Sequence, residues 1–157
     1  MAARFAAERG VPPTLLMQMR RCVAQLDEVM KGFGLTTDQT DYARLNDEFH
    51  EILLECAQST MIKRSLERVK SLPFAAPNAF VKSSRSELPG VRTILIVAQE
   101  QHRSILEAIE SREGARAQAP AIEHSRSASK YLRLALDAKE PLNQVPGINL
   151  IRRRSAG

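Results

Sequence analysis

The sequence has 157 residues, a net charge of +5, 43% hydrophobic residues and only 4% aromatic residues. A chain of this length forms one domain, and no apolar run reaches the roughly 18 residues that a membrane span requires. The residues after Met1 lack the charged and apolar regions of a secretory signal, so we expect a cytoplasmic protein without a membrane partner. The positive charge is weak evidence for nucleic-acid binding, because residues 152–154 supply much of it.

Apolar residues recur at three- and four-residue steps along most of the chain, which predicts an all-α fold without a sheet. Glycines, prolines and capping residues mark the ends of the periodic segments. We expect helices over about residues 1–9, 13–31, 37–57, 60–71, 90–112 and 114–137. Thr36 or Thr37 should cap the third of them. The fourth should direct an apolar face inward, made of Met61, Ile62, Leu66 and Val69.

Three other features shape the expected organisation. Residues 73–89 contain several prolines and serines and read as a long connection, with one helical turn after Pro77. Pro120 cannot donate a hydrogen bond inside the last expected helix, so we expect a kink or a late start there. Residues 138–157 read as a tail whose apolar side chains dock on the body or on a partner. The cysteines, Cys22 and Cys56, lie at apolar positions and are expected as reduced core residues.

The strongest helical pattern lies in residues 42–57, where Asn46 and His50 stand one turn apart beside the apolar face. An amide oxygen and an imidazole in that arrangement can share one metal ion. The other histidines, His102 and His124, occupy slots in the apolar stripes of two further helices. A lone histidine on an apolar face is usually a core residue, which is the competing interpretation. Three inward-facing histidines on three helices favour a shared metal, which would provide a partner for each imidazole.

The chain resembles the FCD domain, the ligand-binding C-terminal domain of FadR-type regulators in the GntR family, in three segments: AARFAAERG, YARLNDEFHEILLECA and AQEQHRSILEAIESREGARAQAPAIEHS. The likeness covers residues 1–137. It implies an antiparallel bundle of six or seven helices, often dimeric, which in many members binds a divalent metal through an Asp or Asn and three histidines. The matching positions here are Asn46, His50, His102 and His124. Asn46 stands where many members have Asp, which weakens metal affinity, and Pro120 interrupts the helix of His124.

The resemblance implies that the chain senses an effector and forms a homodimer. The metal would be Zn, or else Ni or Mn, and neutral ligands would leave its +2 charge to attract a small carboxylate. Arg4 and Arg44 are candidates for further contacts with that carboxylate, against the more ordinary role of surface charges. Leftover apolar residues on the first helix and the tail also favour the homodimer. Operator DNA is expected as a partner only through the family's winged helix-turn-helix domain, which has no counterpart before residue 42.

Other interpretations stay open. Asp47 is an alternative ligand in place of Asn46. A second interpretation is that the metal activates a water for hydrolysis, although no obvious general base lies beside the ligands. A third is that the metal only holds the bundle together or is absent, since some members of the family bind a fatty acyl-CoA without metal.

Overall fold

The structure is a computed structural model that describes residues 1–32, 40–70 and 90–137. In these ranges the helices are α1 (Ala2–Arg9), α2 (Pro13–Lys31), α3 (Thr40–Cys56), α4 (Thr60–Lys70), α5 (Val91–Glu110) and α6 (Gly114–Asp137). The all-α prediction is confirmed, and the described ranges contain no strand. The predicted caps Thr36 and Thr37, the connection 73–89 and the tail 138–157 lie outside the described residues.

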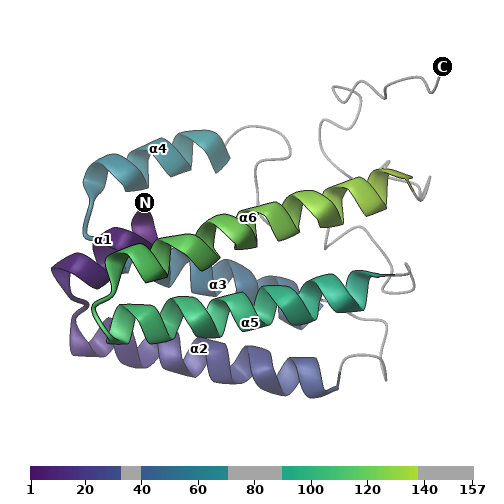
Figure 1. Ribbon diagram of the computed structural model, residues 1–157, viewed down its shortest axis with the longest axis horizontal. Coiled ribbons are helices and arrows are strands. Elements are labelled where there is room, and N and C mark those ends of the chain that lie inside the picture. The colour runs from purple at the N-terminus through teal and green to yellow at the C-terminus, as the bar shows by residue number, and fades with distance from the viewer. Residues whose placement is uncertain (33–39, 71–89, 138–157) are drawn as a thin grey trace.

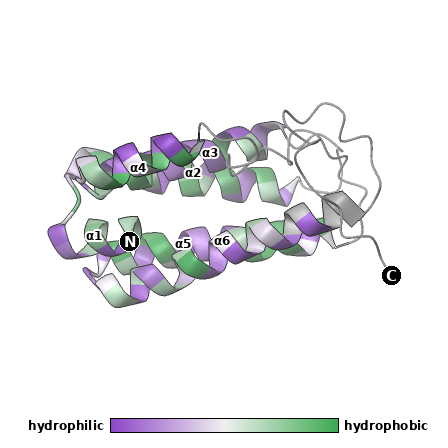
Figure 2. Ribbon diagram, turned by 90° about the horizontal axis from the view of Figure 1, so that it is seen from above, coloured by the Kyte–Doolittle hydropathy of each residue, from purple (hydrophilic) through white to green (hydrophobic). Residues whose placement is uncertain are grey.

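The helices pack as an antiparallel bundle in two layers. Seen from above, α2, α3 and α4 form one layer, and α1, α5 and α6 form the other (Figure 2). Helix α5 packs along α6 and α2 along α3, while the short α1 contacts α6, α3 and α5. Helix α4 lies on the outside of the bundle near the α1 end (Figure 1). No described helix combines the length and apolar character needed to cross a lipid bilayer.

The core lies between the layers and is built from the inward stripes of the helices. Met19 of α2, Phe49 of α3 and Ile105 of α5 are among the largest fully buried side chains. Burial of each such side chain stabilises the fold by about 1.5–3 kcal/mol. Cys22 and Cys56 are also buried, as expected, and burial raises the pKa of their thiols to about 12 and about 11. Both therefore remain protonated core residues near neutral pH.

Helix α1 is held against the bundle by small side chains. Ala3, Ala6 and Ala7 are all buried, which lets the helix approach its neighbours closely. The homodimer prediction counts the first helix among the elements with leftover apolar residues. The alanine face of α1 is covered within the chain, whereas Met1 is 64% exposed and Phe5 is half-buried, so the homodimer stays a prediction.

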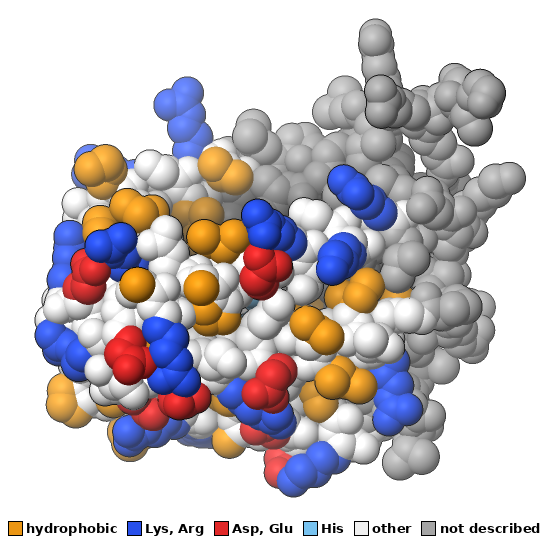
Figure 3. Space-filling model, viewed as in Figure 1, with side chains coloured by type: hydrophobic (Ala, Val, Ile, Leu, Met, Phe, Trp, Pro, Cys, Tyr) orange, Lys and Arg blue, Asp and Glu red, His pale blue; other side chains and the backbone are white. Residues whose placement is uncertain are grey.

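Helix α4 corrects part of the expected core. The sequence places Met61 and Val69 on an inner face, but they are 76% and 47% exposed, whereas Ile62 and Leu66 are half-buried. Hydrophobic side chains are visible at the surface over α4 (Figure 3). The periodicity therefore predicts the helix correctly but not how fully its apolar face is covered.

Helix α6 begins at Gly114 and continues as one helix through Pro120, so the expected late start is wrong. The Ala117 N–H donates to the Glu113 carbonyl at 2.8 Å, which forms the first turn ahead of the proline. Pro120 removes one internal donor, and helical structure nevertheless extends past it to His124.

One end of the bundle is closed by hydrogen bonds that we call the α1 clasp, made by Arg9, Gly10, Gln58 and Arg112. Arg9 Nη1 donates to the carbonyl oxygens of Ala57 at 3.0 Å and Gln58 at 2.8 Å. Gln58 Nε2 donates to the Gly10 carbonyl at 2.7 Å, and Arg112 Nη2 donates to the Glu8 carbonyl at 2.9 Å. The Glu8 carbonyl lies in the last turn of α1 and the others follow the last turns of α1 and α3, where helical donors run out. The clasp therefore fixes the ends of α1, α3 and α5 relative to one another.

The turn from α5 to α6 depends on Arg112, whose φ of 62° is uncommon for a residue with a side chain. Its N–H donates to the Ile109 carbonyl at 3.1 Å, and the Glu113 N–H donates to the Ala108 carbonyl at 2.9 Å. This pair of bonds is the Schellman ending of a helix. Because the chain reverses within a few residues, α6 returns along α5 and brings His124 beside His102.

Candidate metal centre

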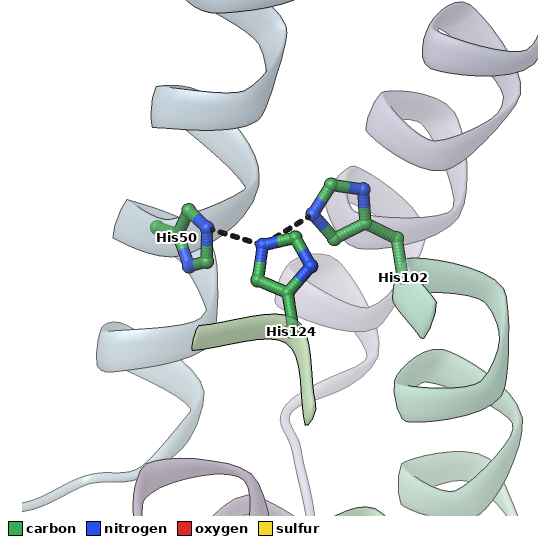
Figure 4. A group of neighbouring side chains, drawn as sticks. All are labelled: His50, His102 and His124. Atoms are coloured by element: carbon green, nitrogen blue, oxygen red, sulfur yellow. Dashed lines mark hydrogen bonds between the residues drawn. The ribbon is translucent and has the colours of Figure 1, made fainter. Parts of the chain in front are cut away.

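The three histidines of the chain come together between the two layers. His50 lies on α3, His102 on α5 and His124 on α6, each on the inward side of its helix (Figure 4). His102 is completely buried, His124 is nearly so and His50 is half-buried. The inward slots that the sequence assigned to these residues are therefore confirmed in space, with His50 at the more open side.

The ring nitrogens converge closely enough to share one ion. Nε2 of His124 lies 3.1 Å from Nε2 of His50 and 3.2 Å from Nε2 of His102. One nitrogen from each ring falls within 4.8 Å of the others. With Zn–N bonds of about 2.0–2.1 Å, two nitrogens on a tetrahedral ion are about 3.3–3.4 Å apart. The two distances to His124 are close to that value, and the nitrogens of His50 and His102 lie within 4.8 Å of each other, so the three rings can share a small divalent ion.

Phe49 forms an apolar wall beside the cluster. Its ring centroid lies 4.3 Å from that of His102 and 5.7 Å from that of His50. Phe49 is itself fully buried, so it excludes water from the inner side of both imidazoles. Low local polarity strengthens the bond between an ion and its nitrogen ligands.

Two of the imidazoles are held in the neutral form. Burial lowers the pKa of His102 well below the ordinary value of 6.5, and the nearby His124 and His50 lower it further. Burial also lowers the pKa of His124 to about 4, against an opposing influence of the Ala98 backbone. Neutral imidazole is the form that binds a metal, so both rings are ready to bind one near neutral pH.

The cluster does not provide a hydrogen-bond partner for every ring nitrogen. Nδ1 of His124 is buried and has no partner among the described residues. The Ala98 backbone is near enough to oppose the fall of the His124 pKa, but it forms no hydrogen bond of normal geometry with that ring. Nδ1 of His102, by contrast, lies 3.0 Å from Oε1 of Gln99. Nδ1 of His124 is not the nitrogen that faces the other rings, so the reason to expect a bound group is the convergence of the three Nε2 atoms.

Asn46 lies where the sequence predicts it, buried on α3 one turn before His50. Asp47 is half-buried on the same helix, and the group of converging ligand atoms does not include its carboxylate. Neither residue is tested as a ligand by this arrangement, so the role of Asn46 stays a prediction.

Arg4 and Arg44 are both exposed and paired with acids on their own helices. Arg4 Nε lies 2.7 Å from a Glu8 carboxylate oxygen, while Arg44 lies 3.6 Å from Asp41 and 3.6 Å from Glu48. Their predicted contacts with an effector stay predictions. The pairing is what an ordinary surface charge would show.

Gln99 and Asp27 are polar residues at the site that the sequence analysis does not single out. Gln99 is buried on α5 one turn before His102, and its amide also contacts Asp27 on α2. The three-residue step from Gln99 to His102 is a signal that the sequence does contain. Asp27 carries no such signal, because its approach depends on how α2 packs on α5.

The family model of the FCD domain matches residues 1–127, which is most of the chain. A comparison with curated proteins finds no match. FCD domains are regulatory domains that bind effectors. The match agrees with the resemblance read from the sequence and with the helical bundle, and the chain therefore belongs to the FCD domain family.

Proposed function

We propose that this chain is the effector-sensing domain of a transcriptional regulator and binds one divalent metal through His50, His102 and His124. The convergence of three Nε2 atoms from three helices is the observation that carries the proposal. Asn46 is the fourth protein ligand in this proposal. Imidazole nitrogens suit Zn first, with Ni and Mn as alternatives.

The effector that fits this site is a small organic acid. Three neutral imidazoles and one amide leave the ion with its full positive charge, and no Asp or Glu of the described residues belongs to the cluster. A carboxylate in the open coordination positions would neutralise that charge and supply the oxygen ligands that such ions accept. No Asp or Glu of the described residues is among the converging ligand atoms, which favours sensing over hydrolysis by an acid of the cluster itself.

The sensing domain would act on operator DNA through the winged-helix domain that the family joins to it, in the cytoplasm. We also propose that it works as a homodimer. Exposed apolar residues of α4, Met61 and Val69, support association more than α1 does. Light scattering at micromolar concentration should give twice the 17.5 kDa mass of one chain. A monomer at that concentration would contradict the proposed dimer and would leave the proposed metal site unaffected.

Metal analysis tests the site directly. Purified protein reloaded with Zn at neutral pH should carry about one equivalent per chain, as a structural or sensing site does. The His102→Ala/His124→Ala double variant should carry none. Gln101→Leu, a substitution on α5 outside the cluster, should bind normally and controls for damage to the helix. A wild-type content below roughly a tenth of an equivalent would remove the proposal.

A thermal-shift screen of hydroxy- and dicarboxylates tests the effector class. A ligand at a hundredfold excess over its Kd stabilises the folded state by about 2.7 kcal/mol. Metal-loaded wild type should respond to some of these acids, and His50→Ala should not. Equal responses in both proteins would mean that the acids do not bind through the metal. Responses only to neutral apolar compounds would favour an acyl-chain sensor instead.

A further inference from the structure

The Gln99 side chain makes three contacts that together fix the orientation of its amide. Nε2 donates to the Val23 carbonyl at 3.2 Å and to Oδ1 of Asp27 at 2.5 Å. Oε1 faces Nδ1 of His102 at 3.0 Å. A carbonyl and an ionised carboxylate can only accept hydrogen bonds, so the amide nitrogen has to face them. The reversed amide would place an oxygen against two other acceptors.

The orientation of the amide decides which nitrogen of His102 carries the proton. Oε1 of Gln99 can only accept, so Nδ1 of His102 has to be the donor across that 3.0 Å contact. A neutral imidazole holds one proton, and Nε2 of His102 therefore keeps its lone pair. That nitrogen is the one that faces His124 in the cluster.

Asp27 is in turn held by a surface arginine. Arg103 donates to Oδ1 of Asp27 from Nη2 at 2.7 Å and from Nε at 3.0 Å, and to Glu100 from Nη1 at 2.7 Å. The contacts form a chain from the surface of α5, through the Asp27 carboxylate of α2 and the buried Gln99 amide, to the innermost imidazole. Gln99 is 2% exposed, so water has little access to its amide.

We propose that Gln99 and Asp27 are positioning residues of the metal centre, which hold His102 in the tautomer and ring orientation that present Nε2 to the ion. The inference rests on the proposed metal site and adds residues that touch no ion themselves. Hydrogen bonds to the far nitrogen of a ligating histidine fix its tautomer and raise its basicity, and their loss lowers metal affinity by about 10–100-fold. The Gln99 amide performs that task here, and Asp27 sets which way the amide points.

Nitrogen NMR of the histidine rings in metal-free protein provides a test that does not need the metal. Wild-type His102 should show a protonated Nδ1 and an unprotonated Nε2. Gln99→Leu, which keeps the bulk of the side chain without its polar atoms, should release the ring into a mixture of both tautomers. Gln101→Leu is the matched control on the same helix, because Gln101 accepts a hydrogen bond from Ser127 and touches no imidazole in the described structure. A wild-type His102 protonated at Nε2 would overturn the inference, even if no variant folded.

Zinc affinity, measured by competition with a chelator, provides the second readout. Gln99→Leu should lose about 10–100-fold in affinity, while Gln101→Leu stays at the wild-type value. Asp27→Asn should fall between them, because it keeps an acceptor for the Gln99 amide but loses the charge and the Arg103 pairing. Unchanged affinity in Gln99→Leu overturns the positioning role alone. A wild type that binds no metal removes the proposed function and the positioning role together, and the wild-type measurement by itself identifies that case.

Discussion

The α1 clasp and the histidine cluster are both groups of polar side chains between helices, but they differ in how their hydrogen bonds are completed. In the clasp, Arg9, Gln58 and Arg112 are donors, and each meets carbonyl oxygens at the end of a helix. In the cluster, nitrogens from three imidazoles face one another, and Nδ1 of His124 has no partner among the described residues. The donors of the clasp are paired with acceptors of the chain itself, whereas the cluster brings imidazole nitrogens together that can accept a bond from a cation.

This difference separates a structural polar group from a binding site. Donors matched to orphan carbonyls stabilise the ends of helices and require nothing from outside the chain. Converging acceptors in a buried place cost free energy unless a cation joins them. With Gln99 holding the proton of His102 on Nδ1, a lone pair of that ring points at its neighbour. The cluster therefore lowers the stability of the metal-free protein while it provides ligands for an ion. The pH dependence of the free energy of unfolding should reveal this loss.

The largest expected effect is a loss of stability of the metal-free protein in mild acid. The pKa of His124 is 6.5 when unfolded and about 4 when folded, and that of His102 is also lowered by folding. Between these values the unfolded chain binds more protons, so stability is full above about pH 6.5 and falls as the pH drops toward 4. Each pKa unit corresponds to about 1.4 kcal/mol, so His124 alone should cost roughly 3 kcal/mol. Urea unfolding of chelated protein at a series of pH values measures this loss.

The His102→Ala/His124→Ala variant is the control for that experiment. In this variant the free energy of unfolding should still change slowly with pH because of the carboxylates. The steep fall between about pH 6.5 and 4 should be absent. The clasp residues include no histidine, so the clasp should not contribute to this difference between the two proteins. If the wild type and the double variant showed equal slopes, the buried histidines would not carry the expected cost.

Much of the fold and part of the site follow from the sequence, because both depend on periodicity along single helices. The stripes around Met19, Phe49 and Ile105 place these residues in the core, and the same spacing directs His50, His102 and His124 inward. Inward-facing histidines on three adjacent helices have little room to avoid one another.

The remaining features depend on packing between helices, which spacing along one helix does not encode. Asp27 reaches Gln99 only because α2 lies along α5 at one particular register. The exposure of Met61 and Val69 depends on how little of α4 is covered. The clasp joins residues nearly fifty and more than a hundred positions apart, as in the contact of Arg112 with Glu8, which is 104 residues away. Neither partner has a sequence signal that points to the other.

A smaller effect should follow from disturbing the clasp at Gly10. Its backbone, at φ 84° and ψ 143°, is nearly restricted to glycine, and a Cβ there would lie 1.9 Å from Nη1 of Arg112. Gly10→Ala should therefore cost about 1–3 kcal/mol from the backbone alone. For a domain of this size each kcal/mol lowers the melting temperature by about 2–4 °C. Calorimetry of the variant measures the change.

Gly32 is the matched control for Gly10. It ends α2 at φ −79°, and among the described residues a Cβ there would meet only the Val29 carbonyl, at 3.7 Å. Gly32→Ala should be neutral or stabilise by up to about 1 kcal/mol, since alanine restricts the unfolded chain. Equal losses at both positions would mean that the clasp contributes no special constraint. An unchanged zinc affinity of Gly10→Ala would show that the clasp does not contribute to metal binding by the cluster.

The smallest effects are expected at Arg4 and Arg44, which belong to neither region. Each is about half exposed and pairs with acids on its own helix, and such pairs contribute at most about 0.5 kcal/mol. Arg4→Ala and Arg44→Ala should therefore change the free energy of unfolding by no more than that amount, as should Arg126→Ala, whose pair with Glu123 is also exposed. Titration of the metal-loaded variants with a responding carboxylate then distinguishes a surface charge from an effector contact. Their exposure and pairing favour unchanged affinity at both positions. A loss of tenfold or more, about 1.4 kcal/mol, at Arg4 or Arg44 but not at Arg126 would assign that arginine to the effector site.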